Sequence, residues 1–204
     1  MNPEILKAIY VIITAKMELR TLTGVFIFIL SLPIIGILVI TNTGTNVVSN
    51  ALATLNGTTH LITVHDPLGK MVTQIQATTV WPVKGVVTLE FGESDLPYQP
   101  LHTGIDIADK TGDPITPFMK GKIIDVEHLS WGYGNYVVID HGNNITSLYG
   151  HMNQTKATIG QDVKPGDIIG YEGQTGWTTG PHVHFEIRVL GIPVNPRTFV
   201  EGNP

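Results

Sequence analysis

The chain of 204 residues contains no cysteine. This absence excludes a disulfide framework and a thiolate-bound structural zinc, so any zinc site must use histidine and carboxylate side chains. Charged residues are also scarce, at 14% of the chain, and the net charge is −5. Without a basic run or patch, the sequence indicates no nucleic-acid partner.

The sequence after Trp81 lacks any long stretch with the 3.6-residue period of a helix. It has instead short runs rich in β-branched residues, separated by Gly, Pro and Asn, which are typical of strands. These runs lie at 86–91, 122–128, 135–140, 144–151 and 166–173. We therefore predict an all-β domain over 81–204, an antiparallel sheet forming a partly open barrel or sandwich. The run from Asn135 to His151 predicts a hairpin whose tip lies at 141–144.

One long apolar run without charge occupies residues 21–40. At about 1.5 Å per residue, a helix of this length crosses a hydrocarbon core of about 30 Å. Lys7, Lys16 and Arg20 precede it, and the next basic residue after it is Lys70. The positive-inside rule then predicts a single-pass protein of the cell membrane, with a cytoplasmic N-terminus and an extracytoplasmic domain. A cleaved signal peptide, a buried helix, and a segment that inserts late in a secreted or virion-associated protein are alternatives.

The segments that flank this run have weaker patterns. Residues 1–20 have apolar positions at helical spacing, which indicates either an amphipathic helix on the membrane surface or an extension of the spanning helix. Residues 41–80 are predicted to be a linker or stalk, most clearly at 41–59, which is rich in Thr, Asn and Gly. Within 61–65, LITVH favours a strand, followed by a DPLG turn, as part of a stalk or as an extra strand laid on the domain.

Histidine is well represented, with eight residues, and three strings are notable: HTGID at 102–106, LYGHM around His151, and HVH at 182–184. Alternate residues of a strand face the same side, so His182 and His184 are expected to project together. A straight strand would separate His102 from Asp106 by roughly 13 Å, too far for one metal ion. The HTGID segment must therefore turn, and Gly104 permits a turn without a Cβ clash.

These strings resemble those of the lysostaphin-type (M23) zinc metallopeptidases, the LytM-domain endopeptidases of peptidoglycan. The matching strings, in family order, are WPVKGVVTLEFG, HTGIDIA, GNYVVIDHG, LYGHM, VKPGDIIGYEGQTGWTTGPHVHFEI and PVNP. The resemblance implies one Zn²⁺ ion held by His102, Asp106 and His184, with an open fourth position. It also implies catalytic roles for His151 and His182. The sequence departs from the family at Glu93–Ser94, where Arg is frequent, and at Met152, where Leu is usual.

The family resemblance implies a function and a groove. It implies hydrolysis of peptide cross-links or bridges of bacterial peptidoglycan, in a narrow groove with walls expected at 92–101, 128–134 and 174–181. The Trp in the loop 174–181 would either stack on the substrate or serve as a packing anchor for the loop.

A non-catalytic activator of a cell-wall amidase is one alternative to the enzyme function. Another is a wall-degrading component of a larger envelope or virion complex, such as a phage tail or a conjugation machine. His128 and His141 are expected to be solvated.

Overall fold

The computed structural model describes residues 47–59, 61–76, 78–94 and 101–204. The chain divides into residues 1–41 and 42–204, and every described residue belongs to the second part. The helices predicted at 1–20 and 21–40 lie outside the described residues. Within the described ranges, no helix has the length and apolar character needed to cross a bilayer.

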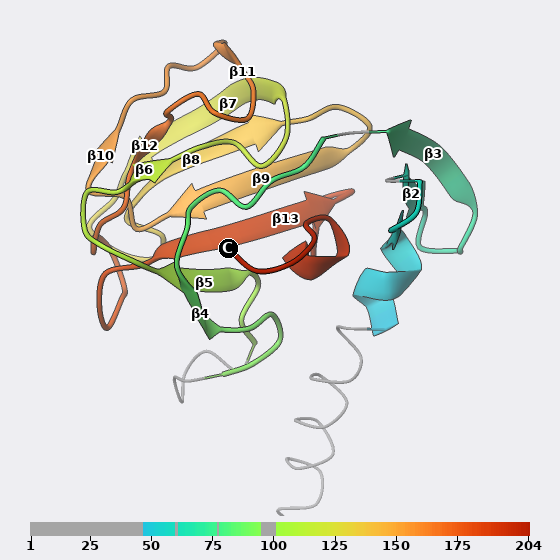
Figure 1. Cartoon of the computed structure of the whole chain (residues 1–204), viewed down its shortest axis with the longest axis horizontal. Helices are drawn as coiled ribbons and strands as arrows, with labels where there is room; N and C mark the ends of the chain where they lie inside the picture. Colours follow the sequence, from blue (N-terminus) through green and yellow to red (C-terminus); the bar gives the residue numbers. More distant parts are fainter. Residues whose placement is uncertain (1–46, 60, 77, 95–100) are drawn as a thin grey trace, which may run out of the picture. The chain divides into compact units, whose positions relative to one another are not determined.

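An antiparallel sheet forms the centre of the fold (Figure 1). Its strands follow the order β11 (Asp162–Val163), β7 (Gly121–His128), β8 (Asn135–Asp140), β9 (Ile145–Gly150), β13 (Val183–Val189), β5 (Ile105–Ala108) and β4 (Val86–Leu89). The short strand β14 (Ile192–Val194) pairs with the last residues of β13. The first residues of β13 pair with β5, and its other edge pairs with β9. Strand β13 therefore pairs with three other strands, β9, β5 and β14.

Two smaller sheets accompany the main one. One contains β10 (Gln154–Thr155), β12 (Gly170–Tyr171) and β6 (Pro114–Ile115), and the other contains β1 (Ala53–Asn56), β2 (Leu61–His65) and β3 (Met71–Gln76). The 3-10 helix η1 (Pro196–Thr198) follows β14. The predicted all-β, antiparallel class is confirmed. The strands of the described residues do not close into a barrel, because β11 and β4 remain the two ends of the main sheet.

The predicted hairpin is formed by β8 and β9, which pair in antiparallel register. Asn143 and Asn144 at its tip have φ angles of 54° and 61°. Asn adopts this left-handed region more readily than most residues, so the sequence suits the turn. The Asp140 carboxylate accepts a hydrogen bond from the Gly142 amide at 2.8 Å, which further stabilises the turn.

Alternation along the strands separates the core from the face that carries polar residues. Ile105 and Ile107 of β5 are fully buried in the apolar core, and Asp106 between them lies on the opposite face. In β13 the core positions are Val183, Phe185, Ile187 and Val189, and the positions between them are His184, Glu186 and Arg188. Because β5 and β13 are neighbours, their polar faces combine into one surface.

The segment predicted to be a linker has regular structure where it is described. Residues 47–52 are helical, and β1 follows directly. Leu52, Ala53, Ile62 and Val64 are buried in the same apolar cluster as the main sheet. The composition of 41–59 predicted a linker; at 47–56 the structure has a helical segment and β1 instead, with Leu52 and Ala53 buried in the core.

The strand and turn predicted at 61–69 are present. LITVH is β2, and its alternating burial places Ile62 and Val64 inside. The Asp66 carboxylate accepts hydrogen bonds from the amides of Leu68 and Lys70, both at 2.9 Å, which defines the turn before β3. The side-chain carboxylate replaces backbone partners in the turn, as expected for Asp at its start.

Candidate metal centre and groove

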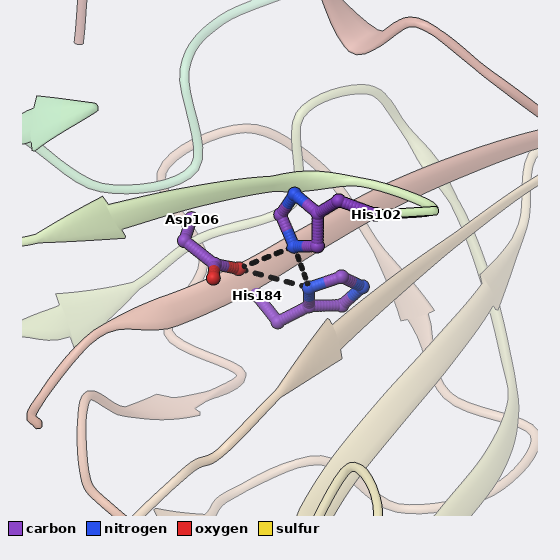
Figure 2. A group of neighbouring side chains, drawn as sticks. All are labelled: His102, Asp106 and His184. Atoms are coloured by element: carbon purple, nitrogen blue, oxygen red, sulfur yellow. Dashed lines mark hydrogen bonds and ion pairs between the residues drawn. The ribbon is translucent and has the colours of Figure 1, made fainter. Parts of the chain in front are cut away.

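Three side chains, from β5, from β13 and from the segment before β5, converge on the polar face of the main sheet (Figure 2). The Nε2 atom of His102 lies 3.0 Å from Oδ1 of Asp106 and 3.0 Å from Nδ1 of His184. The Nδ1 atom of His184 lies 2.9 Å from the same Oδ1 of Asp106. The antiparallel register of β13 with β5 pairs His184 directly with Asp106. This register brings together two donors that are 78 residues apart in the chain.

The segment that carries His102 bends before β5, as its spacing requires. Gly104 lies at the bend, where an added Cβ would come 2.4 Å from the Phe185 carbonyl oxygen and 2.9 Å from Cε1 of His184. Any other residue would push β5 away from β13. The glycine is therefore required by the close approach of the two strands, in addition to the bend itself.

The donor set fits a divalent metal ion such as zinc. Tetrahedral Zn²⁺ with bonds of about 2.0–2.1 Å places its ligand atoms about 3.3 Å apart, close to the three separations observed. Two imidazoles and one carboxylate are also a donor set of catalytic zinc sites. Burial alone would raise the pKa of Asp106, but hydrogen bonds from His102 and His184 lower it well below its usual range. Asp106 is therefore ionised at neutral pH.

Each histidine of this group has a partner on its other nitrogen. Nδ1 of His102 donates to the backbone carbonyl of Glu90 at 3.1 Å, which leaves Nε2 directed at the group. Nε2 of His184 lies 3.5 Å from Oε2 of Glu186, which leaves Nδ1 directed at Asp106. Such outer partners fix the tautomer and the ring orientation of a metal-binding histidine.

Glu186 was not identified from the sequence. It is fully buried and also accepts hydrogen bonds from the Tyr133 hydroxyl at 3.0 Å and from Nε of Arg188. Burial raises the pKa of Glu186, but the charges of His184 and Arg188 lower it to about 2. The sequence does contain a signal, because Glu186 is two residues beyond His184 in a strand and so shares its face.

Glu90 is held in place by Arg197 of η1. This is a second contribution to the metal centre that the sequence did not reveal. The Arg197 guanidinium donates to both carboxylate oxygens of Glu90, at 2.7 and 3.0 Å. The same guanidinium lies 5.5 Å from the Trp81 ring, whose Nε1 donates to the Glu201 carbonyl. This cluster fixes the chain segment whose carbonyl oxygen holds His102.

His151 and His182 lie beside the three converging residues. Their rings are 4.7 Å apart, and His151 lies 6.0 Å from the His184 ring. Nδ1 of His151 donates to the Thr175 carbonyl at 2.8 Å, and Nδ1 of His182 lies 2.9 Å from the Gly180 carbonyl. His151 has φ of 59°, a strained conformation for a non-glycine residue, immediately after β9. The structure therefore gathers all five residues singled out in the sequence.

The protonation of these two rings differs. Burial, aided by the neighbouring His182 and His184, lowers the pKa of His151 to about 4. Burial also lowers the pKa of His182, but the Asp106 carboxylate opposes this shift, and Nε2 of His182 lies 3.4 Å from Oδ2 of Asp106. His151 is therefore neutral at neutral pH, with an unprotonated Nε2, whereas His182 carries a proton more readily.

A groove of about 540 Å³ opens over these residues. Its lining includes Glu93 from the loop after β4, Trp131 and Tyr133 from the loop between β7 and β8, and Trp177 and Thr178 from the loop after β12. The described parts of the three predicted wall segments thus all line it. A groove of this size accommodates a short extended peptide.

His141 differs from the solvated histidine expected at the hairpin tip. Its Nδ1 donates to the Lys120 carbonyl at 2.9 Å, and its Nε2 lies 2.7 Å from Oγ of Ser147. The ring also packs against Phe118, with centroids 4.6 Å apart. These contacts lie outside the groove and join the hairpin to the core.

Comparison with known proteins identifies the family. The family model of peptidase family M23 matches residues 100–196. The catalytic domain of a mutant of the prophage-encoded M23 protein EnpA from Enterococcus faecalis is 41% identical, with a TM-score of 0.52, over 56% of this chain and 90% of that chain. The chain belongs to peptidase family M23.

Other M23 neighbours differ in what their names describe. A zinc-containing peptidase from Vibrio cholerae is 30% identical with a TM-score of 0.56, over 74% of this chain and 47% of that chain. The DD-carboxypeptidase/endopeptidase Mpg of Neisseria meningitidis serogroup B is 44% identical over 96 residues, or 47% of this chain and 22% of Mpg. The murein hydrolase activator NlpD of Escherichia coli is 35% identical over 120 residues, or 59% of this chain and 30% of NlpD. The chain thus spans less than a third of each of these two curated relatives.

Proposed function

We propose that this M23 protein is a zinc-dependent endopeptidase that hydrolyses peptide cross-links or bridges of bacterial peptidoglycan. The observation that carries the proposal is the convergence of His102, Asp106 and His184 on the floor of the groove, with His151 and His182 beside them. The match to Mpg, whose name describes DD-carboxypeptidase and endopeptidase activity, supports the reaction class.

The metal would be held by Nε2 of His102, Oδ1 of Asp106 and Nδ1 of His184. Zinc bound there supplies Lewis acidity toward a carbonyl oxygen and lowers the pKa of a bound water toward 7. Glu90 and Glu186 keep the lone pairs of the two histidines directed at the site. The carboxylates of Asp106 and Glu186 raise the pKa of His184 to about 9 against the effect of its burial, so this ring would have to lose its Nδ1 proton to hold the metal.

The two remaining histidines move protons. His151 accepts a proton at Nε2, because its Nδ1 is committed to the Thr175 carbonyl and its low pKa keeps it neutral. Nδ1 of His182 lies on the Gly180 carbonyl, so its Nε2, 3.4 Å from Oδ2 of Asp106, carries a proton only in the doubly protonated ring; in that form His182 would stabilise negative charge that develops on the substrate carbonyl oxygen. Proton transfer by positioned side chains contributes about 10²- to 10⁴-fold to the rate.

The test is hydrolysis of purified peptidoglycan by the full chain, with released fragments identified by mass spectrometry. His184→Ala is expected to lose both zinc and activity. His151→Ala is expected to retain most of the zinc while its activity falls by about 10²-fold or more. His128→Ala is the matched control, because His128 is exposed and does not line the groove. Normal cleavage by His151→Ala would remove its assigned role, and absence of cleavage by wild-type protein loaded with zinc would refute the proposal.

A non-catalytic activator of a cell-wall amidase is the second candidate, favoured by the match to NlpD. An activator needs no metal for its effect on a partner. If the His184→Ala variant stimulates a purified amidase as well as wild type does, while neither cleaves peptidoglycan, the activator function is correct. The complete set of five polar residues favours the enzyme.

We further propose that residues 21–40 anchor the protein in the cell membrane with the M23 domain outside. The uncharged run and the basic residues before it support this location. Extraction of a membrane fraction with carbonate is the test, because a spanning helix remains in the pellet. Recovery of the intact chain in the soluble fraction would favour a secreted or virion-associated protein, including one that serves in a larger wall-breaching complex.

A further inference from the structure

Two tryptophans stand exposed at the groove. Trp131, from the loop between β7 and β8, and Trp177, from the loop after β12, have exposed fractions of 59% and 61%. Both line the groove that contains the candidate metal centre, and their ring centroids are 6.3 Å apart with planes inclined at 56°. We call this pair the aromatic corner. Exposure of two large aromatic side chains at one place is costly in water and marks a binding surface.

The aromatic corner is held by backbone hydrogen bonds between its two loops. The Trp177 amide donates to the Gly132 carbonyl at 2.9 Å, and the Asn135 amide donates to Oγ1 of Thr175 at 2.9 Å. Gly134 has φ of 64°, and a Cβ there would lie 2.4 Å from the Thr175 backbone. Because the loops are joined in this way, the two rings are positioned before any ligand arrives, which lowers the entropic cost of binding.

The charge of the groove indicates what the corner binds. Among the described residues that line the groove there is no Lys or Arg, and Glu93 is the acidic residue that is not assigned to the metal centre. Next to the corner, Tyr136 also lines the groove and donates to Oδ2 of Asp125 at 3.2 Å. The pKa of Tyr136 is raised by burial and then by the negative charges of Asp125 and Glu127.

One basic side chain, Arg188, has the opposite effect and lowers the pKa of Tyr136. Its guanidinium is paired with the buried Glu186, so it contributes little net positive charge to the groove. Apart from the metal centre, the described groove lining therefore presents no cationic side chain that would repel a positive charge at the corner. An ammonium group placed over the face of a tryptophan is attracted by the ring, most strongly when it is partly desolvated.

We infer that the aromatic corner formed by Trp131 and Trp177 is a subsite for a free ammonium group on the substrate peptide. The inference rests on the proposed function for the identity of the substrate, which would be a wall peptide containing a diamino acid. A side-chain amine of such a residue would lie against the two rings while the peptide backbone extends along the groove toward the metal centre. The subsite would select peptides whose side-chain amine is free.

The test uses two probes that differ only in this charge: Nα-acetyl-lysyl-D-alanine amide and the same peptide with its side-chain amine acetylated. Binding to the zinc-loaded full chain is followed by tryptophan fluorescence. Wild type is expected to bind the free amine about 3- to 30-fold more tightly than the acetylated probe, and Trp131→Ala and Trp177→Ala are each expected to reduce that preference. Ile159→Ala is the matched control, because Ile159 is 61% exposed, as Trp177 is, but does not line this groove, so its replacement should leave the response intact.

A kinetic readout separates binding from a general loss of structure. On a cross-linked peptide with a free amine, the Trp131→Ala and Trp177→Ala variants should show a raised KM with little change in kcat, because a subsite remote from the metal contributes equally to ground state and transition state. A Trp131→Phe variant should recover part of the affinity, because phenylalanine retains a π face.

Equal affinity of wild type for the two probes would overturn the proposal. Tighter binding of a disaccharide-peptide that the tryptophan variants lose, regardless of amine acetylation, would also overturn it and assign the corner to a sugar ring. The binding measurement requires no hydrolysis. If wild type discriminates the probes but cleaves no peptidoglycan, the proposed function fails while the subsite stands. If it cleaves peptidoglycan without discriminating the probes, only the subsite fails.

Discussion

At the scale of single residues, the candidate metal centre depends on side chains that never touch the metal position. Glu186 lies beneath His184 and compensates the charge that His184 or a metal ion would bring into the sheet. Tyr133 and Arg188 in turn hold the two carboxylate oxygens of Glu186. Such buried polar networks are stabilising only when every member has a partner, and this one is satisfied on both oxygens.

Replacement of Glu186 by Gln tests this arrangement. The variant retains a similar volume and an oxygen near His184, but it removes the negative charge. We expect zinc affinity to fall by about 10- to 100-fold, which is typical of an outer partner of a metal ligand. Competition with a chelator measures the affinity directly. Glu172→Gln is the matched control, because Glu172 is also fully buried but accepts from the Asp109 amide and does not contact a metal-ligating histidine. A similar loss in both variants would contradict the role of Glu186.

At the scale of secondary-structure elements, the site depends on segments remote from it. The helix η1 supplies Arg197, which fixes Glu90 at the end of β4, and the Glu90 carbonyl in turn orients His102. The β8–β9 hairpin supplies His141, whose ring connects the tip to Ser147 and to the Phe118 segment. Arg197 of η1 and His141 of the hairpin therefore each hold a neighbouring segment in position through side-chain contacts.

The Arg197→Gln variant is expected to weaken zinc binding without removing a ligand. Loss of the guanidinium releases Glu90, and the His102 tautomer becomes less well fixed. The loss should be about 3-fold or more, yet smaller than for an outer partner that contacts the ligand. The free energy of unfolding should change by no more than about 1 kcal/mol, because the pair is partly exposed. Lys122→Gln, which breaks the exposed ion pair with Asp162, should leave zinc affinity unchanged in chelator titrations.

His141 predicts a pH dependence of stability. Burial lowers its pKa to about 4 from a usual value of 6.5, against opposing effects of the Lys120 carbonyl and Asp140. The unfolded chain therefore binds a proton at higher pH than the folded protein does. The contribution is fully present above pH 6.5 and is lost as the pH falls toward 4, by on the order of 2–3 kcal/mol.

Urea unfolding at pH 7, 5.5 and 4 measures this effect against the His141→Asn variant. Other groups titrate in both proteins, so the difference between the two isolates His141. Wild type should lose more stability than the variant over this range. Parallel loss in the two proteins would show that His141 is not held neutral by its surroundings.

At the scale of the whole described domain, one apolar core includes the small β1–β2–β3 sheet. Leu52, Ala53, Ile62 and Val64 are buried together with residues of the main sheet, and the Asn195 amide donates to Oγ of the buried Ser49 at 2.7 Å. The family model begins only at residue 100. The segment from 47 to 76 therefore packs into the same core although it precedes the residues that the family model matches.

Ile62→Ala distinguishes an integral segment from a stalk. If Ile62 belongs to the domain core, the variant should lose about 2–5 kcal/mol of unfolding free energy. For a domain of this size, that corresponds to a decrease in Tm of roughly 5–15 °C. Val72→Ala on β3, where Val72 is 46% exposed, should change Tm only slightly. A melting curve of Ile62→Ala that matches wild type would show that the segment is independent of the core.

Much of the fold and of the candidate site follows from local sequence. The runs of β-branched residues predicted the strands, and the two-residue period predicted that His182 and His184 project together, as they do on the lining of the groove. The distance argument for HTGID required a bend at Gly104, where the structure has one. The same local argument failed at 47–56, because docking on a distant core decided the structure of a segment whose composition resembles a linker.

The sequence by itself determined which atoms are available: imidazole and carboxylate donors, on strands whose alternation sets the face of each side chain. The tertiary structure alone decided that His184 pairs opposite Asp106, that the Glu90 carbonyl reaches His102, and that Trp131 and Trp177 meet. The physical reason is that the alternation of side chains between the two faces of a strand depends only on residues that are neighbours in the chain. The register between β5 and β13 and the joining of two loops are set instead by the packing of one core across more than 70 residues.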